Sequence, residues 1–196
     1  MMFLVEQSTV PVGVLPIAEL RNHLLLGSGY ADDGAQDAVL EQYLRSAISA
    51  LEARTGKVLL EKQYSWSLTA WHDQVRQVLP VAPVSSVDAL VITDRAGTAT
   101  TVPSTEYGLQ PDEHRPALTS GATILRSIPI GGQAEVTFTA GYGPNWSDVP
   151  PGLQQAVLIL AAHYYDDRSG AHEFPFGINA LIARFRNLRL FGGRRS

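Results

Sequence analysis

The chain has 196 residues, of which 45% are hydrophobic and 17% are charged, as is typical of a folded globular protein rather than a disordered one. It contains no cysteine, which excludes a disulfide scaffold, a thiol nucleophile and a thiolate zinc site. The formal net charge of −4 is unevenly distributed, because residues 176–196 contain five arginines and no acidic residue. The rest of the chain is therefore clearly acidic, and the two ends should meet different surroundings.

The first third of the chain has the pattern of helices. Residues 16–26 predict a short helix. In residues 37–55 apolar side chains recur every three or four positions, which predicts a longer helix with one buried face. Asp37 is suited to the start of this helix, and Gly56 is suited to its end.

From about residue 58 to residue 140 the pattern changes to alternating apolar and polar residues, which is typical of half-buried strands. The turn residues 94–97 predict a hairpin. Further short strands are expected near residues 107–109, 122–125 and 134–140. We therefore predict an antiparallel, strand-rich region.

Helices return after this region. Pro150 and Pro151 fit the first turn of a helix that runs to Asp167, and this helix is apolar on nearly all sides, as buried helices are. A last helix follows, with an apolar stripe that includes Ile178 and Phe185.

These elements predict an α+β fold within a single domain, residues 1–196. The helices of residues 16–55 and 150–190 are expected to form a helical bundle that carries the strand-rich region, about 58–140, as an insert. Residues 184–196 form a basic C-terminal tail.

Gly141 and Gly143, which flank a tyrosine, invite comparison with glycine loops that bind phosphate. Such loops need further glycines and a lysine at the start of a helix, and neither is present here. We interpret both glycines, with Pro150 and Pro151, as a structural hinge between the strands and the helices.

Candidate catalytic groups are few. His163 and Asp167 are four residues apart, and His172 follows, so a metal-dependent hydrolase remains an alternative. The spacing is not HExxH, and there is no GxSxG motif for a serine nucleophile. We predict no catalytic residue, no metal and no cofactor, and therefore no enzyme.

Acidic residues near the end of a helix oppose its dipole. Asp166 and Asp167 hold such positions, next to Arg168. We expect these acids to pair with Arg168, with arginines of the last helix, or with a neighbouring subunit.

The basic tail could also bind nucleic acid through its phosphates, which makes a small nucleic-acid-binding protein the second reading. The tail has no interleaved aromatic platform of the kind that single-strand binders use. The longest strongly apolar run, residues 156–162, is too short to cross a membrane, and the N-terminus has no pattern of a signal peptide.

Five stretches that together span nearly the whole chain carry a family resemblance. In chain order they are LPIAELRNHLLL, LEQYLRSAISALEARTGKVLLEKQYSWSL, VTFTAGYG, VPPGLQQAVLILAAHYYDDR and PFGINALIARFRNLRL. Their order resembles that of head–tail connector (adaptor) proteins of tailed bacteriophages, and equally that of the adaptors of phage-like gene transfer agents.

The resemblance implies a structural protein of the virion or phage-like particle, assembled in the bacterial cytoplasm and placed at the head–tail junction. It implies a homo-oligomeric ring of twelve copies beneath the portal protein, which extends the DNA channel and offers a surface to a stopper or tail-end protein. DNA would pass through without sequence-specific binding. The resemblance also implies that the C-terminal segment binds the portal, through Arg184, Phe185, Arg186, Arg189, Leu190, Phe191, Arg194 and Arg195.

Overall fold

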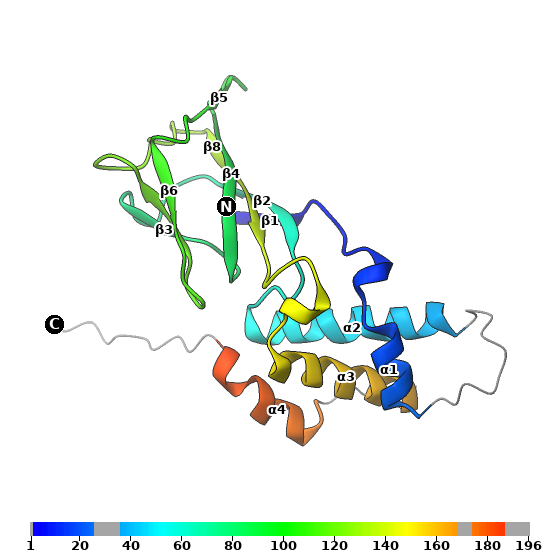
Figure 1. The fold of residues 1–196 in the computed structure, drawn as a ribbon. Helices are drawn as coiled ribbons and strands as arrows, with labels where there is room; N and C mark the ends of the chain where they lie inside the picture. Colours follow the sequence, from blue (N-terminus) through cyan, green and yellow to red (C-terminus); the bar gives the residue numbers. More distant parts are fainter. Residues whose placement is uncertain (1, 26–35, 168–173, 187–196) are drawn as a thin grey trace.

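The structure, a computed structural model, describes residues 2–25, 36–167 and 174–186 (Figure 1). Figure 1 shows the strands gathered in one part of the molecule and the helices in the other. Each part has its own cluster of buried apolar side chains. The chain is therefore an α+β protein, as the sequence predicts. None of the helices in the described ranges is long and apolar enough to cross a membrane.

Two antiparallel sheets make up the strand-rich part. The larger sheet has the order β1-β2-β8-β4-β5 and the smaller has the order β3-β7-β6. Their bounds are β1 Met2–Glu6, β2 Lys62–Leu68, β3 Arg76–Val78, β4 Val84–Thr93, β5 Ala99–Thr101, β6 Tyr107–Gln110, β7 Ala117–Ser120 and β8 Gln133–Ala140. On β2 and β8 alternate residues are buried, such as Trp66 and Phe138, so one face of the large sheet covers the apolar cluster.

The helical part is centred on α2 and α3, which pack along one another and are both contacted by α1, while α4 packs on α3. The bounds are η1 Val12–Val14, α1 Ile17–His23, α2 Asp37–Thr55, η2 Trp146–Asp148, α3 Pro151–Asp166, α4 Phe176–Ile182 and η3 Ala183–Phe185. Leucines of α2 and α3, such as Leu44 and Leu160, are fully buried between the helices. The long helix has the predicted bounds and ends at Gly56, whose φ of 70° is left-handed.

The two parts are joined by backbone hydrogen bonds among three segments, residues 57–62, 82–84 and 140–143. The bonds are Val58 N to Ala82 O at 2.8 Å, Gly141 N to Pro83 O at 3.0 Å, Tyr142 N to Leu59 O at 3.3 Å and Glu61 N to Gly143 O at 2.9 Å. The join is therefore a hydrogen-bonded crossing of three segments, not a single connecting strand.

Both glycines of the join occupy places that a larger residue would not fit. Gly141 has a φ of 139°, and a Cβ there would lie 2.6 Å from the Glu61 Cα and 2.7 Å from the Leu60 carbonyl carbon. A Cβ on Gly143 would lie 2.5 Å from a carboxylate oxygen of Asp148. Glycine thus allows β8 to turn directly against the segment that leads into β2.

Some predicted elements are placed differently in the structure. The strand expected at residues 122–125 is absent from the described residues, and β7, at residues 117–120, pairs with β6 and β3 instead. Asp37 does not cap α2 with its side chain; it lies in the first turn, after Gln36. β1 was not predicted at all.

Candidate interaction site

The last described residues are anchored to α3 by apolar side chains. Ile178 and Ile182 of α4 are fully buried, and Phe185, at the end of η3, is 2% exposed. The Phe185 ring lies over Gly152 in the first turn of α3, where an added Cβ would be 3.6 Å from it. Burying such a side chain contributes about 1.5–3 kcal/mol. The chain is therefore held to its own core up to Phe185.

The arginines on either side of Phe185 are exposed, in contrast to its buried ring. Arg184 and Arg186 are both exposed, and the Arg184 guanidinium carbon lies 4.4 Å from the centre of the Phe185 ring. This cation–π contact holds one positive charge close to the end of the described chain. Two arginines are thus accessible at this end.

The structure changes the part that Phe185 can play. The family resemblance implies that Phe185 is an apolar portal anchor, but its ring is buried in the chain's own helical cluster and is not open to a partner. Of the other predicted contacts, Arg189, Leu190, Phe191, Arg194 and Arg195 lie outside the described residues. Their role stays a prediction.

The predicted acidic pairs at the end of α3 also stay a prediction. Asp166 is exposed and Asp167 is partly buried, whereas Arg168 lies outside the described residues. The hydrogen bond from the Asp167 N–H to the His163 carbonyl, at 2.9 Å, closes the last turn of the helix.

Tyr142, between the two glycines of the join, lies in the electrostatic field of this C-terminal end. Burial raises the pKa of Tyr142 to about 12, Glu113 adds to the rise, and Arg184 opposes it. Its hydroxyl is buried and has no hydrogen-bond partner among the described residues. The join, the Glu113 turn and the root of the C-terminal segment are therefore close enough to influence one another.

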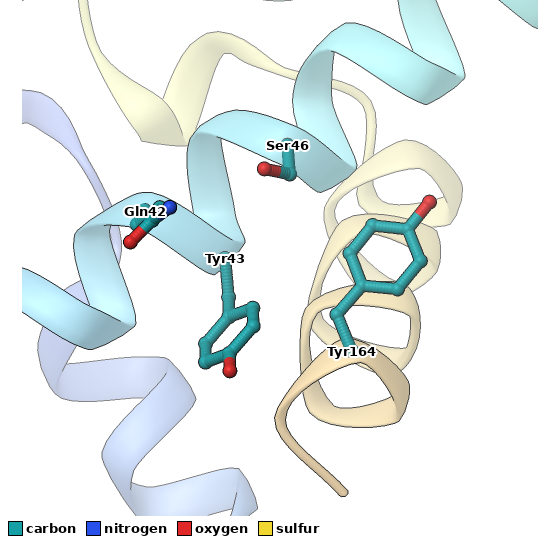
Figure 2. Close-up of a pocket in the computed structure, with 4 residues that line it drawn as sticks. All are labelled: Gln42, Tyr43, Ser46 and Tyr164. Carbon is teal, nitrogen blue, oxygen red and sulfur yellow. The ribbon is translucent and has the colours of Figure 1, made fainter. Parts of the chain in front are cut away.

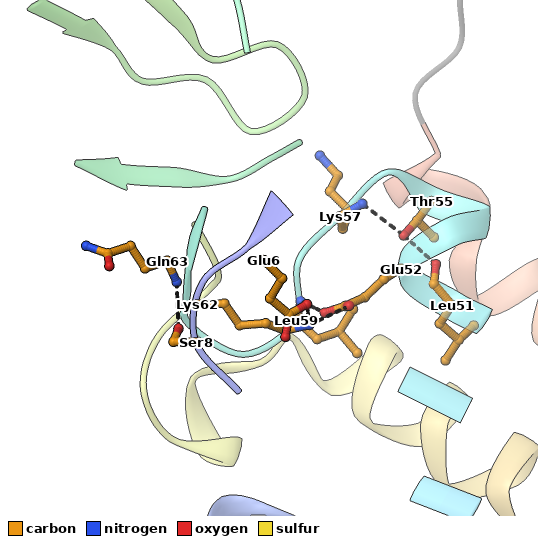
Figure 3. A network of polar contacts seen from close by, with 9 residues as sticks. All are labelled: Glu6, Ser8, Leu51, Glu52, Thr55, Lys57, Leu59, Lys62 and Gln63. Atoms are coloured by element: carbon orange, nitrogen blue, oxygen red, sulfur yellow. Dashed lines mark hydrogen bonds and ion pairs between the residues drawn. The ribbon is translucent and has the colours of Figure 1, made fainter. Parts of the chain in front are cut away.

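A buried ion network fastens α2 to the strands beside the join (Figure 3). The Glu52 carboxylate accepts hydrogen bonds from the Leu59 N–H at 2.8 Å and from the Lys62 amine at 2.9 Å. Lys62 also donates to Glu6 of β1 at 3.2 Å. The network thus connects α2, β2 and β1.

In this network burial disfavours the charged forms of Glu52 and Lys62, whereas the pairing between them favours both charged forms. Burial raises the pKa of Glu52, although Lys62 and the Leu59 N–H both favour its charged form. For Lys62, burial opposes the charged form, but the carboxylates of Glu52 and Glu6 outweigh it and raise the pKa. The lysine therefore stays protonated inside the join.

A second buried lysine holds the turn between β6 and β7. Lys57 is 1% exposed; its amine donates to the Glu113 carbonyl and lies 3.0 Å from Nδ1 of His114. Burial lowers the pKa of Lys57, and the charges of Glu113 and Asp112 oppose that shift. This contact attaches the tip of the small sheet to the end of α2.

No role was predicted from the sequence for Lys57, Glu52 or Lys62. The available signal was a pair of lysines that bracket the apolar run 58–60 directly after the glycine that ends a helix. Lysines in such a position must be paired if they are buried, which only the fold could establish.

The described surface has a pocket of about 290 Å³ between α2 and α3 (Figure 2). Gln42, Tyr43 and Ser46 of α2 and Tyr164 of α3 line it. These side chains offer hydroxyl and amide groups but no charge. Across residues 2–25, 36–167 and 174–186, no three His, Cys, Asp or Glu side chains gather as metal ligands would. His172 of the alternative metal set lies outside those ranges.

Comparison with solved structures gives several matches, and three of them, which cover nearly the full chain, come from gene transfer agent particles. One is a chain in the neck of an empty gene transfer agent (GTA) particle computed with C6 symmetry, with a TM-score of 0.90 and 47% identity. The second is a chain in the virion of a native GTA particle, with a TM-score of 0.87 and 48% identity. The third is a chain in the neck of a native GTA particle computed with C12 symmetry, with a TM-score of 0.85 and 44% identity. Each match covers 98% of this chain and 100% of the other.

No protein-family model and no curated protein matches the chain. Identity of 44–48% over nearly whole chains, together with the same fold, indicates membership of one family and not only a shared fold. Two of the matched chains come from the neck of the particle and the third from its virion, and all three are structural components of it. The chain therefore belongs to the head–tail connector proteins of tailed phages and phage-like gene transfer agents, and it is a structural protein of the particle neck rather than an enzyme.

Proposed function

We propose that this chain is the adaptor that forms a ring of twelve copies beneath the portal and links the head to the stopper or tail. The observation that carries the proposal is the match to necks computed with C12 and C6 symmetry. A protein repeated around such an axis makes head-to-tail contacts that close into a ring. The centre of that ring would continue the channel through which DNA leaves the head.

The segment from Arg186 onward is the proposed contact with the portal. Residues 187–196 contain three arginines together with Leu190 and Phe191, the residue types that often carry most of the binding energy of an interface. Arg184 and Arg186 are already exposed where this segment leaves the core. Phe185 has a different part, because its buried ring fixes the point from which the segment departs.

The distribution of charge suits a channel that DNA must cross without being held. Residues 1–175 are acidic overall and would repel phosphates, whereas the positive charges gather on the segment assigned to the portal. In the rival reading, a nucleic-acid-binding protein, the same arginines would bind phosphates. A gel shift that depends on the tail at physiological salt would favour that reading.

The test is a chain that ends at Arg186, examined in particles. This truncation keeps Phe185, so the helical core stays filled and the protein should fold. We expect DNA-filled heads without tails in electron micrographs. As a matched control, Arg95→Gln removes an exposed arginine elsewhere and should leave joining intact. Normal joining of heads and tails by the truncated chain would contradict the portal contact.

A further inference from the structure

The outer edge of β1 has no strand beside it among the described residues. β1 lies at the end of the five-stranded sheet and pairs with β2 alone, from Met2 opposite Leu68 to Glu6 opposite Tyr64. The Gln7 N–H donates to the Gln63 carbonyl at 2.7 Å. Because bonding alternates along an antiparallel pair, the backbone groups of Met2, Leu4 and Glu6 point to the open edge.

The side chains of this edge are apolar and exposed on both faces. Met2 is 58% exposed, Phe3 65% and Val5 38%. Only Leu4 packs against the apolar cluster of the sheet. Glu6, the one charged residue of the strand, is engaged by Lys62. An edge of this kind is prone to pair with another strand.

The opposite edge of the same sheet is built to avoid such pairing. There β4 is covered by β5 only along residues 91–93, and the uncovered part contains two shifts of register, between Val84 and Ser86 and between Val87 and Ala89. Irregularities of this kind protect an edge. β1 has no register shift, no proline and no lysine. The β4 edge has features that prevent pairing with another strand, and the β1 edge lacks them. This contrast indicates that another protein segment covers β1 in the functional assembly.

We propose that the edge of β1, with Met2, Phe3 and Val5, is the surface through which one copy of this chain contacts the next. A strand or loop of the neighbour would bond to the open backbone, and Phe3 would be buried against it. The inference rests on the proposed ring and names the surface that closes it.

Two observations favour a neighbouring copy over another neck protein. The matched necks repeat around a symmetry axis, so each copy has a neighbour on either side. In Figure 1, β1 lies in the strand-rich part, on the other side of the α2–α3 pair from α4. A lateral contact and a portal contact can then be made at the same time.

A photo-crosslinking amino acid at position 3 tests the contact in assembled particles. p-Benzoylphenylalanine replaces one aromatic side chain with another, and the same group at Ile130, which is 99% exposed, is the matched control. Mass spectrometry first establishes that each variant is present in the neck, which separates this test from the proposed function. We expect position 3 to yield products that join two copies of this chain. A product with a different neck protein, or no copy-to-copy product above the Ile130 control, would overturn the proposal.

A double substitution gives an independent measurement. Phe3→Ser with Val5→Ser removes the exposed apolar side chains and leaves Leu4 in place. We expect binding between copies, measured by mass photometry on portal complexes, to weaken about tenfold or more. Ile130→Ser should leave it unchanged. Equal occupancy of the portal by the double variant and by Ile130→Ser would count against the proposal.

Discussion

The Lys62 amine lies 2.9 Å from the Glu52 carboxylate, so an ion pair links strand β2 to the last turns of helix α2. Both side chains are largely buried, with 9% and 15% of their surface exposed. The pair connects the helical part with the strand-rich part at the place where their backbones cross.

Removing one partner of this pair should cost more than removing an exposed pair. Glu52→Gln leaves the Lys62 charge with only Glu6, and we expect a loss of roughly 3 kcal/mol in the free energy of unfolding. The control is Glu41→Gln, which breaks a partly exposed pair with Arg45 on the same helix and should cost about 0.5 kcal/mol or less. Urea unfolding at neutral pH measures both. Equal losses would mean that the buried pair has no special role.

The protein should lose stability in alkaline solution. Burial raises the pKa of Tyr64 and of Tyr142 to about 12 each, and the carboxylates around Lys62 raise its pKa as well. The folded state therefore holds these protons more tightly than the unfolded state, and stability is lost as pH rises from about 10 upward. Burial lowers the pKa of Lys57, so this lysine destabilises the folded state while it is protonated. That destabilisation disappears as the pH rises to about 10.5, the ordinary pKa of lysine.

Unfolding in urea at about pH 9 and about pH 11, with tyrosinate absorbance followed in parallel, checks this dependence. Tyr64→Phe removes one of the groups and should make the fall in stability shallower. A free energy of unfolding that is the same at both pH values would contradict the predicted protonation.

Gly141→Ala should be strongly destabilising. The alanine Cβ would meet the backbone of Glu61 and Leu60, and its φ would lie where side chains are rarely tolerated. We expect a loss of roughly 3 kcal/mol or more. Gly177→Ala is the control, since it lies in α4 with open space around it and should be neutral or slightly stabilising. Thermal unfolding of the two variants, followed by circular dichroism, distinguishes the two sites.

Lys57→Met should loosen the turn between β6 and β7 without unfolding the chain. The change removes the hydrogen bonds of the amine to the turn and keeps an apolar stem in the buried site. If the substitution lowers the free energy needed to open this turn by about 1.4 kcal/mol, the open form becomes about tenfold more populated. A glutamate-specific protease should then cleave after Glu113 about tenfold faster than in the wild type. Arg95→Met, an exposed substitution in another loop, should leave the rate unchanged.

Periodicity predicts an element well when its own packing decides its form. The helix at residues 37–55 buries one face along its whole length, so its pattern of apolar residues was sufficient. The strand β1 has five residues and an unbroken apolar run, and its edge position is set by pairing with β2, some sixty residues later. Residues 122–125 have strand-like composition, but β6 pairs with residues 117–120, and local pattern cannot choose between them.

The residues of the candidate interaction site also differ in how well the sequence alone could predict their roles. The apolar stripe through Ile178 and Phe185 was visible in the sequence, and a stripe of this kind usually faces the chain's own core. Assigning Phe185 to the portal came from the resemblance, which concerned the segment as a whole and could not separate one ring from its neighbours. The local signal for the lysines of the join was only their place on either side of the apolar run 58–60, because their partners come from segments distant in the chain.

The burial of Phe185 sets a limit on where the portal can be. Residues 187–196 begin one residue beyond Arg186, and ten residues of fully extended chain span at most about 33–36 Å. Any portal surface reached by Arg194 or Arg195 must therefore lie within that radius of the last turn of η3. The first turn of α3, on which the Phe185 ring packs, is thus the fixed point from which the reach of the proposed portal segment is measured.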